Sequence, residues 1–310
     1  MTSPSPGSFP PFLYAGELAT LAAAVIWACT LSVYRRYARG LSAVLLNWFK
    51  NTVALLFLLS CLAIRWLDGT PPASLPGPEV VGWLLLSGLI GFVISDTALF
   101  AGLQRVGAQL TSALQSLVPP VAALLAWFFM GEQLTNWGWA GMALTLVAVL
   151  CVIRTGPGSQ LAGSQRDWVW GITWGITSAV TQAVGFVIAR YALQDVELLT
   201  GTLLRLSPAV LLLMPLALRA GSGWSVLAAS PLQLGRLGTA AVCGGGVGLF
   251  LLAAGTKFAP VGVITTIGAT LPIWVIPVSW LTLGERAKPA QLAWPFLAVA
   301  GVAMLFIGEN

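Results

Sequence analysis

Long apolar runs separated by short polar breaks follow one another along nearly the whole chain. A helix that crosses a membrane needs about 20 mostly apolar residues. Runs of this kind lie at residues 18–37, 43–64, 81–103, 109–130, 137–154, 168–190, 198–218, 234–256, 261–282 and 291–307. The breaks carry arginine, glycine and proline, as in "RRYARG" and "RTGPGSQLAGSQRD". The pattern predicts an all-α polytopic membrane protein with ten transmembrane helices.

The ten runs fall into two sets of five that repeat each other. A shift of 153 positions places "WFFMGE", residues 127–132, on "WLTLGE", residues 280–285, and Pro119 on Pro272. Because five is odd, the second set enters the membrane from the opposite side to the first. The sequence therefore predicts two inverted five-helix repeats, an architecture of secondary transporters in which the substrate site lies between the halves near the midplane.

These repeats divide the chain into four parts. Residues 1–16 are rich in proline and serine and have no lysine or arginine, so they lack the positive start of a secretory signal and are expected to be a mobile leader. The first repeat is expected at residues 17–155, a linker loop at 156–167 and the second repeat at 168–307.

Composition supports a membrane protein and narrows the chemistry. Of the 310 residues, 57% are hydrophobic and 8% are charged, against about 25% charged in soluble domains. The chain has no histidine, which excludes imidazole metal sites and Ser-His-Asp triads. The four cysteines lie singly in apolar runs, as small core residues do. The sequence therefore predicts no catalytic residue, metal site or cofactor, and no nucleic-acid partner, because the cations are scattered over short loops.

Three charged residues lie within apolar runs, where charge is costly and often functional. Asp96, in "GFVISDTALFAG", has Leu249 as its repeat partner. Such an acid could bind a substrate ammonium group or take up a proton; alternatively it bridges to Lys50 or Arg205. These two cations occupy matching positions about two turns into their helices. They could either reach the membrane interface or bind a substrate carboxylate.

Aromatic and small polar residues could line a cavity between the halves. Such residues are equally typical of contacts between membrane helices. Besides Lys50, Asp96 and Arg205, the candidates are Trp27 and its repeat partner Gln182, with Asn47, Thr111, Ser112, Gln115, Phe186, Thr265 and Thr266.

Prolines fall within the fourth and ninth runs at matching places. They are Pro119, Pro120 and Pro272, with Pro277 further along the ninth run. A proline inside a spanning helix frees a carbonyl and allows a kink. These positions could be hinges of alternating access, or kinks that serve static packing.

A Gly-Glu pair ends the fourth and ninth runs. Gly131 and Gly284 are typical of a helix C-terminus. Glu132 and Glu285 follow them and are expected to be structural, accepting hydrogen bonds from the start of the next helix. A role in coupling is the alternative.

The repeat ends "PVAALLAWFFMGEQLTNWGWAGMALTLVAV" and "PIWVIPVSWLTLGERAKPAQLAWPFLAVAGVAML" resemble the EamA units of the drug/metabolite transporter superfamily. The segments "IWACTLSVYRRYA" and "LLNWFKNTVALL" look like the opening of such a unit. The resemblance covers residues 17–307. It implies a ten-helix EamA-type exporter, similar to the amino-acid exporters of the YddG type.

Together these features predict a multi-pass secondary transporter of the bacterial inner membrane that exports small metabolites by alternating access. Amino acids, aromatic ones among them, are the expected substrates, and protons or the substrate's own gradient are the expected energy source. One alternative is a broad-specificity exporter of drugs and lipophilic cations, which would need an acidic, aromatic cavity and would not depend on Lys50. A membrane enzyme acting on lipid-linked substrates is disfavoured because the chain has no histidine, paired carboxylates or large polar loop. A receptor or structural subunit would have a closed, dry core.

Loop charge gives a different orientation from the resemblance. Outside the two intramembrane cations, the loops on the side of the termini hold three cations and those on the other side hold ten. The positive-inside rule places the termini outside, whereas the resemblance implies cytoplasmic termini.

Overall fold

The computed structural model is built from helices. It describes residues 14–38, 40–69, 75–131, 133–155, 164–194, 196–220, 222–258, 266–284 and 289–307. Within these ranges the chain forms α-helices and two π-helical segments, and no strand. Three residues singled out by the sequence, Glu132, Thr265 and Glu285, lie outside the described residues.

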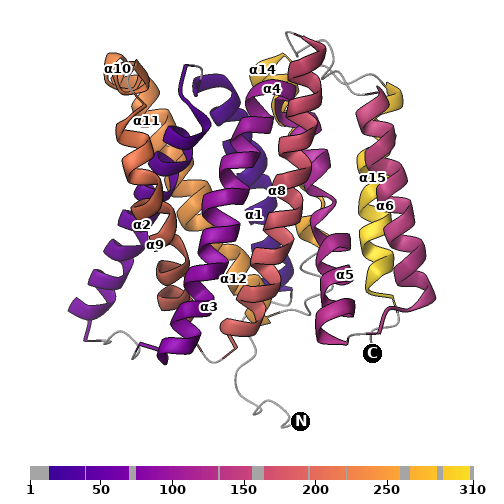
Figure 1. The fold of residues 1–310 in the computed structure, drawn as a ribbon, viewed down its shortest axis with the longest axis horizontal. Helices are drawn as coiled ribbons and strands as arrows, with labels where there is room; N and C mark the ends of the chain where they lie inside the picture. Colours follow the sequence, from indigo (N-terminus) through magenta and orange to yellow (C-terminus); the bar gives the residue numbers. More distant parts are fainter. Residues whose placement is uncertain are drawn as a thin grey trace.

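Two similar series of helices make up the bundle (Figure 1). The first half contains α1 (Ala15–Tyr37), α2 (Ala43–Leu67), α3 (Pro78–Gly88), the π segment η1 (Leu89–Ser95), α4 (Asp96–Gln115), α5 (Val118–Met130) and α6 (Asn136–Thr155). The second half contains α8 (Gln165–Ala192), α9 (Leu198–Leu218), α10 (Ser222–Ala229), α11 (Pro231–Ala240), the π segment η2 (Ala241–Gly248), α12 (Leu249–Phe258), α14 (Leu271–Leu283) and α15 (Pro289–Leu305).

The described helices account for the ten predicted spans. Eight helical stretches are long and apolar enough to cross a membrane, and two further apolar helices are shorter. One of the eight, Pro78–Gln115, is 38 residues long and contains Gly107, whose φ of 83° and ψ of 174° are not helical. The third span therefore ends at Gly107, and the fourth consists of the end of α4 followed by α5. The prediction of an all-α polytopic membrane protein is confirmed.

Helix ends meet on two opposite faces of the bundle. At one, called here the Arg35 face, Arg35 Nη1 donates a hydrogen bond of 2.5 Å to Gln104 O. At the other, called the Arg65 face, Arg65 forms an ion pair with Glu197. Helix α1 runs from the Arg65 face to the Arg35 face, whereas α8 runs the opposite way (Figure 1). The two repeats are inverted, as the odd number of helices in each predicts.

The two halves interlock through their third spans. Helix α8 packs against α3, η1 and α4 of the first half, and α1 packs in the corresponding way against α11, η2 and α12 of the second half. Helices α2 and α9 pack against each other, as do α6 and α15. Each π segment is therefore covered by helices of the other repeat, near the middle of the bundle.

The π segments occupy matching positions in the two repeats. The shift of 153 residues places 89–95 of η1 on 242–248 of η2. The hydrophobic pattern predicts uninterrupted helices over 81–103 and 234–256, so the change of helical register is a difference from that prediction. Single turns of π-helix are rare and recur at functional sites, which directs attention to this level of the bundle.

Three of the four prolines predicted to be hinges lie at helix starts rather than in helix interiors. Pro119 and Pro120 fall in the first turn of α5, and Pro272 in the first turn of α14. A proline there loses no hydrogen bond, because the first amides of a helix have no partner within it. The fourth and ninth spans are therefore interrupted just before these prolines, whereas the sequence predicts kinks at them. Pro277 lies inside α14, as expected.

The glycine caps agree with the prediction. Gly131 ends α5 with a φ of 69° and Gly284 ends α14 with a φ of 72°, both in the left-handed region. Only a residue without a Cβ adopts this conformation readily. Both helices therefore end at the same point of the repeat and for the same reason.

Helices α6 and α15 approach closely at a pair of glycines. A Cβ on Gly141 would lie 2.4 Å from Gly301 O, and a Cβ on Gly301 would lie 2.7 Å from Gly141 O. Both distances are far below van der Waals contact, and the atoms met are main-chain atoms that cannot rotate away. The pairing of the last helices of the two repeats therefore depends on these glycines.

We expect Gly141→Ala to destabilise the protein by about 1–3 kcal/mol, because the added methyl must push α15 away. Gly238→Ala in α11 is the matched control, since a Cβ there meets nothing within 4 Å. The control should be neutral or gain up to about 1 kcal/mol from helix propensity. Thermal unfolding of the purified protein in detergent measures both changes, and equal melting temperatures for the two variants would contradict the prediction.

Candidate substrate site

A buried ion pair joins the second and third spans of the first half. Lys50 of α2 and Asp96, the first residue of α4, approach to 2.5 Å between Nζ and Oδ2. Their side chains are only 13% and 11% exposed. Lys50 Nζ also lies 5.9 Å from the ring centroids of Phe92 and Phe100. Lys50 therefore points into the bundle, and Asp96 bridges to Lys50 rather than to Arg205.

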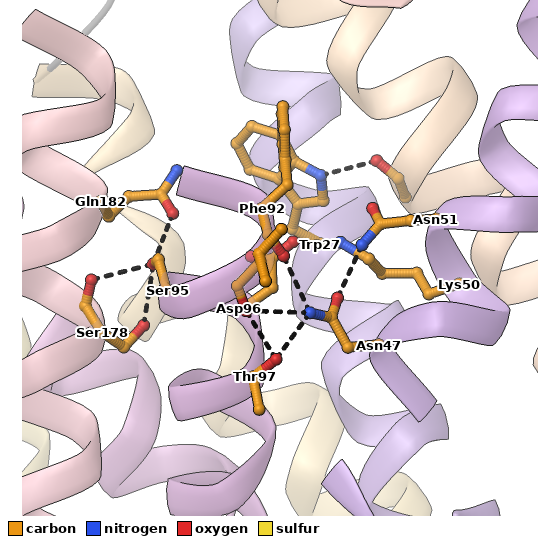
Figure 2. Close-up of polar contacts among 12 residues, drawn as sticks. Trp27, Asn47, Lys50, Asn51, Phe92, Ser95, Asp96, Thr97, Ser178 and Gln182 are labelled. Carbon is orange, nitrogen blue, oxygen red and sulfur yellow. Dashed lines mark hydrogen bonds and ion pairs between the residues drawn. The ribbon is translucent and has the colours of Figure 1, made fainter. Parts of the chain in front are cut away.

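Side chains next to this pair satisfy the main chain of η1 (Figure 2). Asn47 Nδ2 donates hydrogen bonds to Phe92 O at 2.8 Å and to Thr97 Oγ1 at 2.9 Å. Thr97 Oγ1 donates to Val93 O at 2.6 Å, and Asn51 Nδ2 donates to Asn47 Oδ1 at 2.7 Å. A register change leaves carbonyls without helical partners, and no water is available in hydrocarbon to bond them. The amide of Asn47 is a donor to the main chain of η1 at this change of register.

An indole does the same for the π segment of the second half. Trp27 Nε1 donates to Gly244 O at 2.9 Å. A Cβ on Gly248 would lie 2.8 Å from the same nitrogen, so glycine is needed for the indole to approach η2. The N–H of Trp27 is therefore committed to the backbone, and its ring remains available for other contacts.

A second polar cluster lies on the opposite side of η1. Ser95 Oγ lies 2.8 Å from Gln182 Oε1 and 2.9 Å from Ser178 O of α8, and Gln115 Nε2 donates to Ser178 Oγ at 2.9 Å. Figure 2 shows Ser95 directed toward α8, whereas the neighbouring Asp96 is directed toward α2. Gln182 and its repeat partner Trp27 thus both contact the π-segment region of the other repeat.

Arg205 of α9 is the third intramembrane charge and has an incomplete set of partners. Its Nε donates to Ser87 Oγ at 3.0 Å, and Ser87 Oγ donates in turn to Gly185 O at 2.8 Å. Its guanidinium carbon lies 5.0 Å from the centroid of the Phe92 ring. The residue is 8% exposed, and Nη2 is buried without a hydrogen-bond partner among the described residues.

The remaining candidates divide into two groups. Thr111 and Ser112 are buried and bond to carbonyls of their own helix, Gly107 O at 2.7 Å and Gln109 O at 2.9 Å. Phe186 lies on the face of α8 that also carries Ala179 and Gln182, by helical spacing, yet its side chain is 37% exposed. Phe186 is thus exposed although Gln182, about one turn before it on α8, bonds to Ser95.

Several polar residues of the site were not among the sequence candidates. They are Asn51, Ser87, Ser95, Thr97 and Ser178, and the aromatic Phe92 belongs with them. The spacing of Asn47, Lys50 and Asn51 at i, i+3 and i+4 is a signal that the three share one helix face. Nothing comparable marks Ser87 or Ser178, whose partners are far away in sequence.

The arrangement carries a net positive charge. Two cations, Lys50 and Arg205, flank the ring of Phe92, and one carboxylate, Asp96, neutralises Lys50. An inverted-repeat helical bundle with a charged site between its halves is the architecture of a membrane transporter of small substrates.

Comparison with known proteins gives the family. A model described as the EamA-like transporter family matches residues 14–154 and 169–307. The chain therefore belongs to the EamA-like transporters of the drug/metabolite transporter superfamily.

One protein is similar to this chain in sequence, and one solved structure is similar to it in fold. An uncharacterized transporter of Archaeoglobus fulgidus is 26% identical over 146 residues, which are 47% of this chain and 51% of that protein. The match thus spans about half the length of that relative. A solved crystal structure superimposes with a TM-score of 0.64 over 94% of this chain and 95% of the other, at 18% identity. This second likeness concerns the fold alone.

We expect removal of either member of the ion pair to destabilise the protein by roughly 3–5 kcal/mol, because the other charge is left buried. The variants are Lys50→Met and Asp96→Leu, the latter restoring the residue found at the matching position, Leu249. The double variant should recover most of the loss. A double-mutant cycle of thermal unfolding in detergent measures the coupling, and additive losses would contradict a stabilising pair.

Proposed function

We propose that the protein is a secondary transporter that exports small zwitterionic metabolites, amino acids above all, across the bacterial inner membrane by alternating access. The observation that carries this proposal is the Lys50–Asp96 ion pair, which is buried in the first repeat, with Arg205 of the second repeat on the same Phe92 ring that Lys50 approaches. A zwitterion offers one group of each sign to such a site.

Exchange of partners is the chemical basis of binding in this proposal. The ammonium group of the substrate takes the place of Lys50 beside Asp96, and a cation of the site receives the substrate carboxylate. The net charge of the site does not change, because a zwitterion brings one charge of each sign. The desolvation of Lys50 and Asp96 has already occurred during folding, so the site is preorganised and the substrate alone has to lose its water.

The repeat supplies the proposed movement. Interruptions at Ser116–Leu117 and at Ala269–Thr270 lie at matching places, and a π segment precedes each one in its half. Pro119, Pro120, Pro272 and Pro277 border or follow these interruptions, which supports their assignment as hinges. The energy source is then either the gradient of the substrate or a proton gradient.

The site supports this function better than the export of lipophilic cations. A binding site for cations needs a surplus of negative charge, whereas the described site has two cations for one carboxylate.

Counterflow of labelled amino acids into proteoliposomes tests the proposal. We expect the unmodified protein to accumulate label and Asp96→Asn to lose at least tenfold in initial rate, because a neutral amide cannot pair with an ammonium group. Asp68→Asn is the matched control, since Asp68 is an exposed carboxylate at the end of α2 and should leave the rate unchanged. No accumulation of any amino acid by folded protein would refute amino-acid export. Uptake of lipophilic cations in the same vesicles would support the rival function.

A further inference from the structure

The guanidinium of Arg205 is fixed in place, yet it forms no ion pair with another residue that the structure describes, since Asp96 pairs with Lys50. An unsatisfied donor of a charged group costs free energy when it is buried. Among the residues that the structure describes, Nη2 of Arg205 is such a donor, on a residue that is 8% exposed. The free-energy cost of this unsatisfied donor is offset if a ligand binds there and supplies the missing acceptor.

Four contacts fix the side chain and its backbone. Nε is held by Ser87 Oγ, and the guanidinium carbon lies 5.0 Å from the centroid of the Phe92 ring. Ser87 is itself anchored to Gly185 O at 2.8 Å. The backbone of α9 is seated on α3 so closely that a Cβ on Gly88 would lie 1.9 Å from Arg205 O. The free nitrogen is therefore preorganised and does not need to be ordered upon binding.

A glycine lies beside the free nitrogen. Gly91, in η1, has no side chain, and a Cβ at this position would lie 4.0 Å from Arg205 Nη2. A Cβ on Gly185 would lie 3.0 Å from Gly91 Cα, so α8 also needs glycine to pass this point. On the side of η1, Nη2 therefore faces the backbone of Gly91 and no side chain of that residue.

Comparison of the two repeats shows that only the first has an acid at the position of Asp96. Lys50 and Arg205 occupy matching positions in the two halves, and Lys50 is paired with Asp96. The residue that matches Asp96 in the second half is Leu249, so the fold provides no carboxylate for Arg205 at this place. An acceptor from outside, of the size and charge of a carboxylate, would complete the symmetry.

From these observations we infer that Arg205 is the carboxylate-binding residue of the substrate site, and that the carboxylate is the obligatory group of the substrate. This inference rests on the proposed transport function and narrows it. Guanidinium binds carboxylate through parallel hydrogen bonds in a geometry that an ammonium group does not reproduce. Lys50 then stays with Asp96 until the ammonium group of a substrate arrives. Monocarboxylates without an ammonium group therefore also bind, whereas amines without a carboxylate do not bind.

Three probes of one carbon skeleton separate the two charged groups. They are phenylalanine, 3-phenylpropionate, which lacks the ammonium group, and phenethylamine, which lacks the carboxylate. Binding is measured as thermal stabilisation of the purified protein in detergent, which requires no transport, and as inhibition of counterflow in proteoliposomes. We expect stabilisation by the two carboxylates and none by phenethylamine.

Variants then assign the effect to Arg205. Arg205→Gln should weaken the apparent affinity for both carboxylates by roughly 10- to 100-fold, the range of a hydrogen bond to a charged group. Arg205→Lys should keep part of the affinity, because it keeps the charge without the planar donor pair. Arg219→Gln, at the exposed end of the same helix, is the matched control and should bind like the unmodified protein.

A second variant covers the case in which Arg205→Gln does not fold. Gly91→Ala meets only ordinary contacts, at 3.8 Å from Gly185 Cα and 4.0 Å from Arg205 Nη2, so the fold should tolerate it. The methyl group narrows the approach to Nη2 and should weaken carboxylate binding several-fold, with no loss of melting temperature in the absence of a probe.

The outcomes distinguish this inference from the proposed function. If Arg205→Gln keeps its affinity for carboxylates, or if phenethylamine binds as well as phenylalanine, the inference is overturned while amino-acid export stands. If 3-phenylpropionate stabilises the protein through Arg205 but no amino acid is transported, the carboxylate site stands and the proposed export fails. Folded protein that binds neither carboxylate overturns the inference directly.

Discussion

Every polar group of the chain that enters hydrocarbon must find its partner within the protein, and this constraint determines where polar side chains gather. The two π segments break the regular main-chain pattern in the middle of the bundle. Asn47 and Trp27 donate to carbonyls of η1 and η2 respectively. Both residues are substrate candidates by sequence, yet their N–H groups already serve the backbone. Their remaining surfaces, an amide oxygen bonded to Asn51 and an indole ring, leave recognition of charge to other residues.

The inverted repeat provides a symmetric framework, and the chemistry lies where the symmetry is broken. The glycine caps, the interruptions before the prolines and the π segments all recur at one offset. The intramembrane acid does not recur, because Asp96 has Leu249 as its match, whereas the cations Lys50 and Arg205 do occupy matching positions. Trp27 and Gln182 also match in position but differ in chemistry, although each contacts the other half. Duplication thus explains the scaffold, and divergence between the copies explains a site with two cations and one carboxylate.

The parts of the structure that depend on local sequence were predictable. Ten apolar runs, their repetition and the glycine helix ends follow from composition and spacing over a few residues. The π segments were not, because a register change depends on what packs against the helix, as Gly185 packs against Gly91. The sequence did not decide whether Asp96 pairs with Lys50 or with Arg205, since the two cations occupy matching positions in the repeats. The proline positions differed from expectation because helix ends at Gln115 and Val118 fall inside one continuous apolar run.

The surplus cation also bears on how an empty carrier would behave. A charge in hydrocarbon is costly unless it is paired, and the cost falls on whichever conformation buries it most. Because Arg205 has no ion pair among the described residues, a closed and empty site is, on the proposed function, less favourable than a closed and occupied one, in which a carboxylate completes the hydrogen bonds of the guanidinium. Occupancy then lowers the barrier between the two open states. On the proposed function, exchange of substrate for substrate is therefore faster than return of the empty carrier, because the substrate supplies the acceptor that the second repeat lacks.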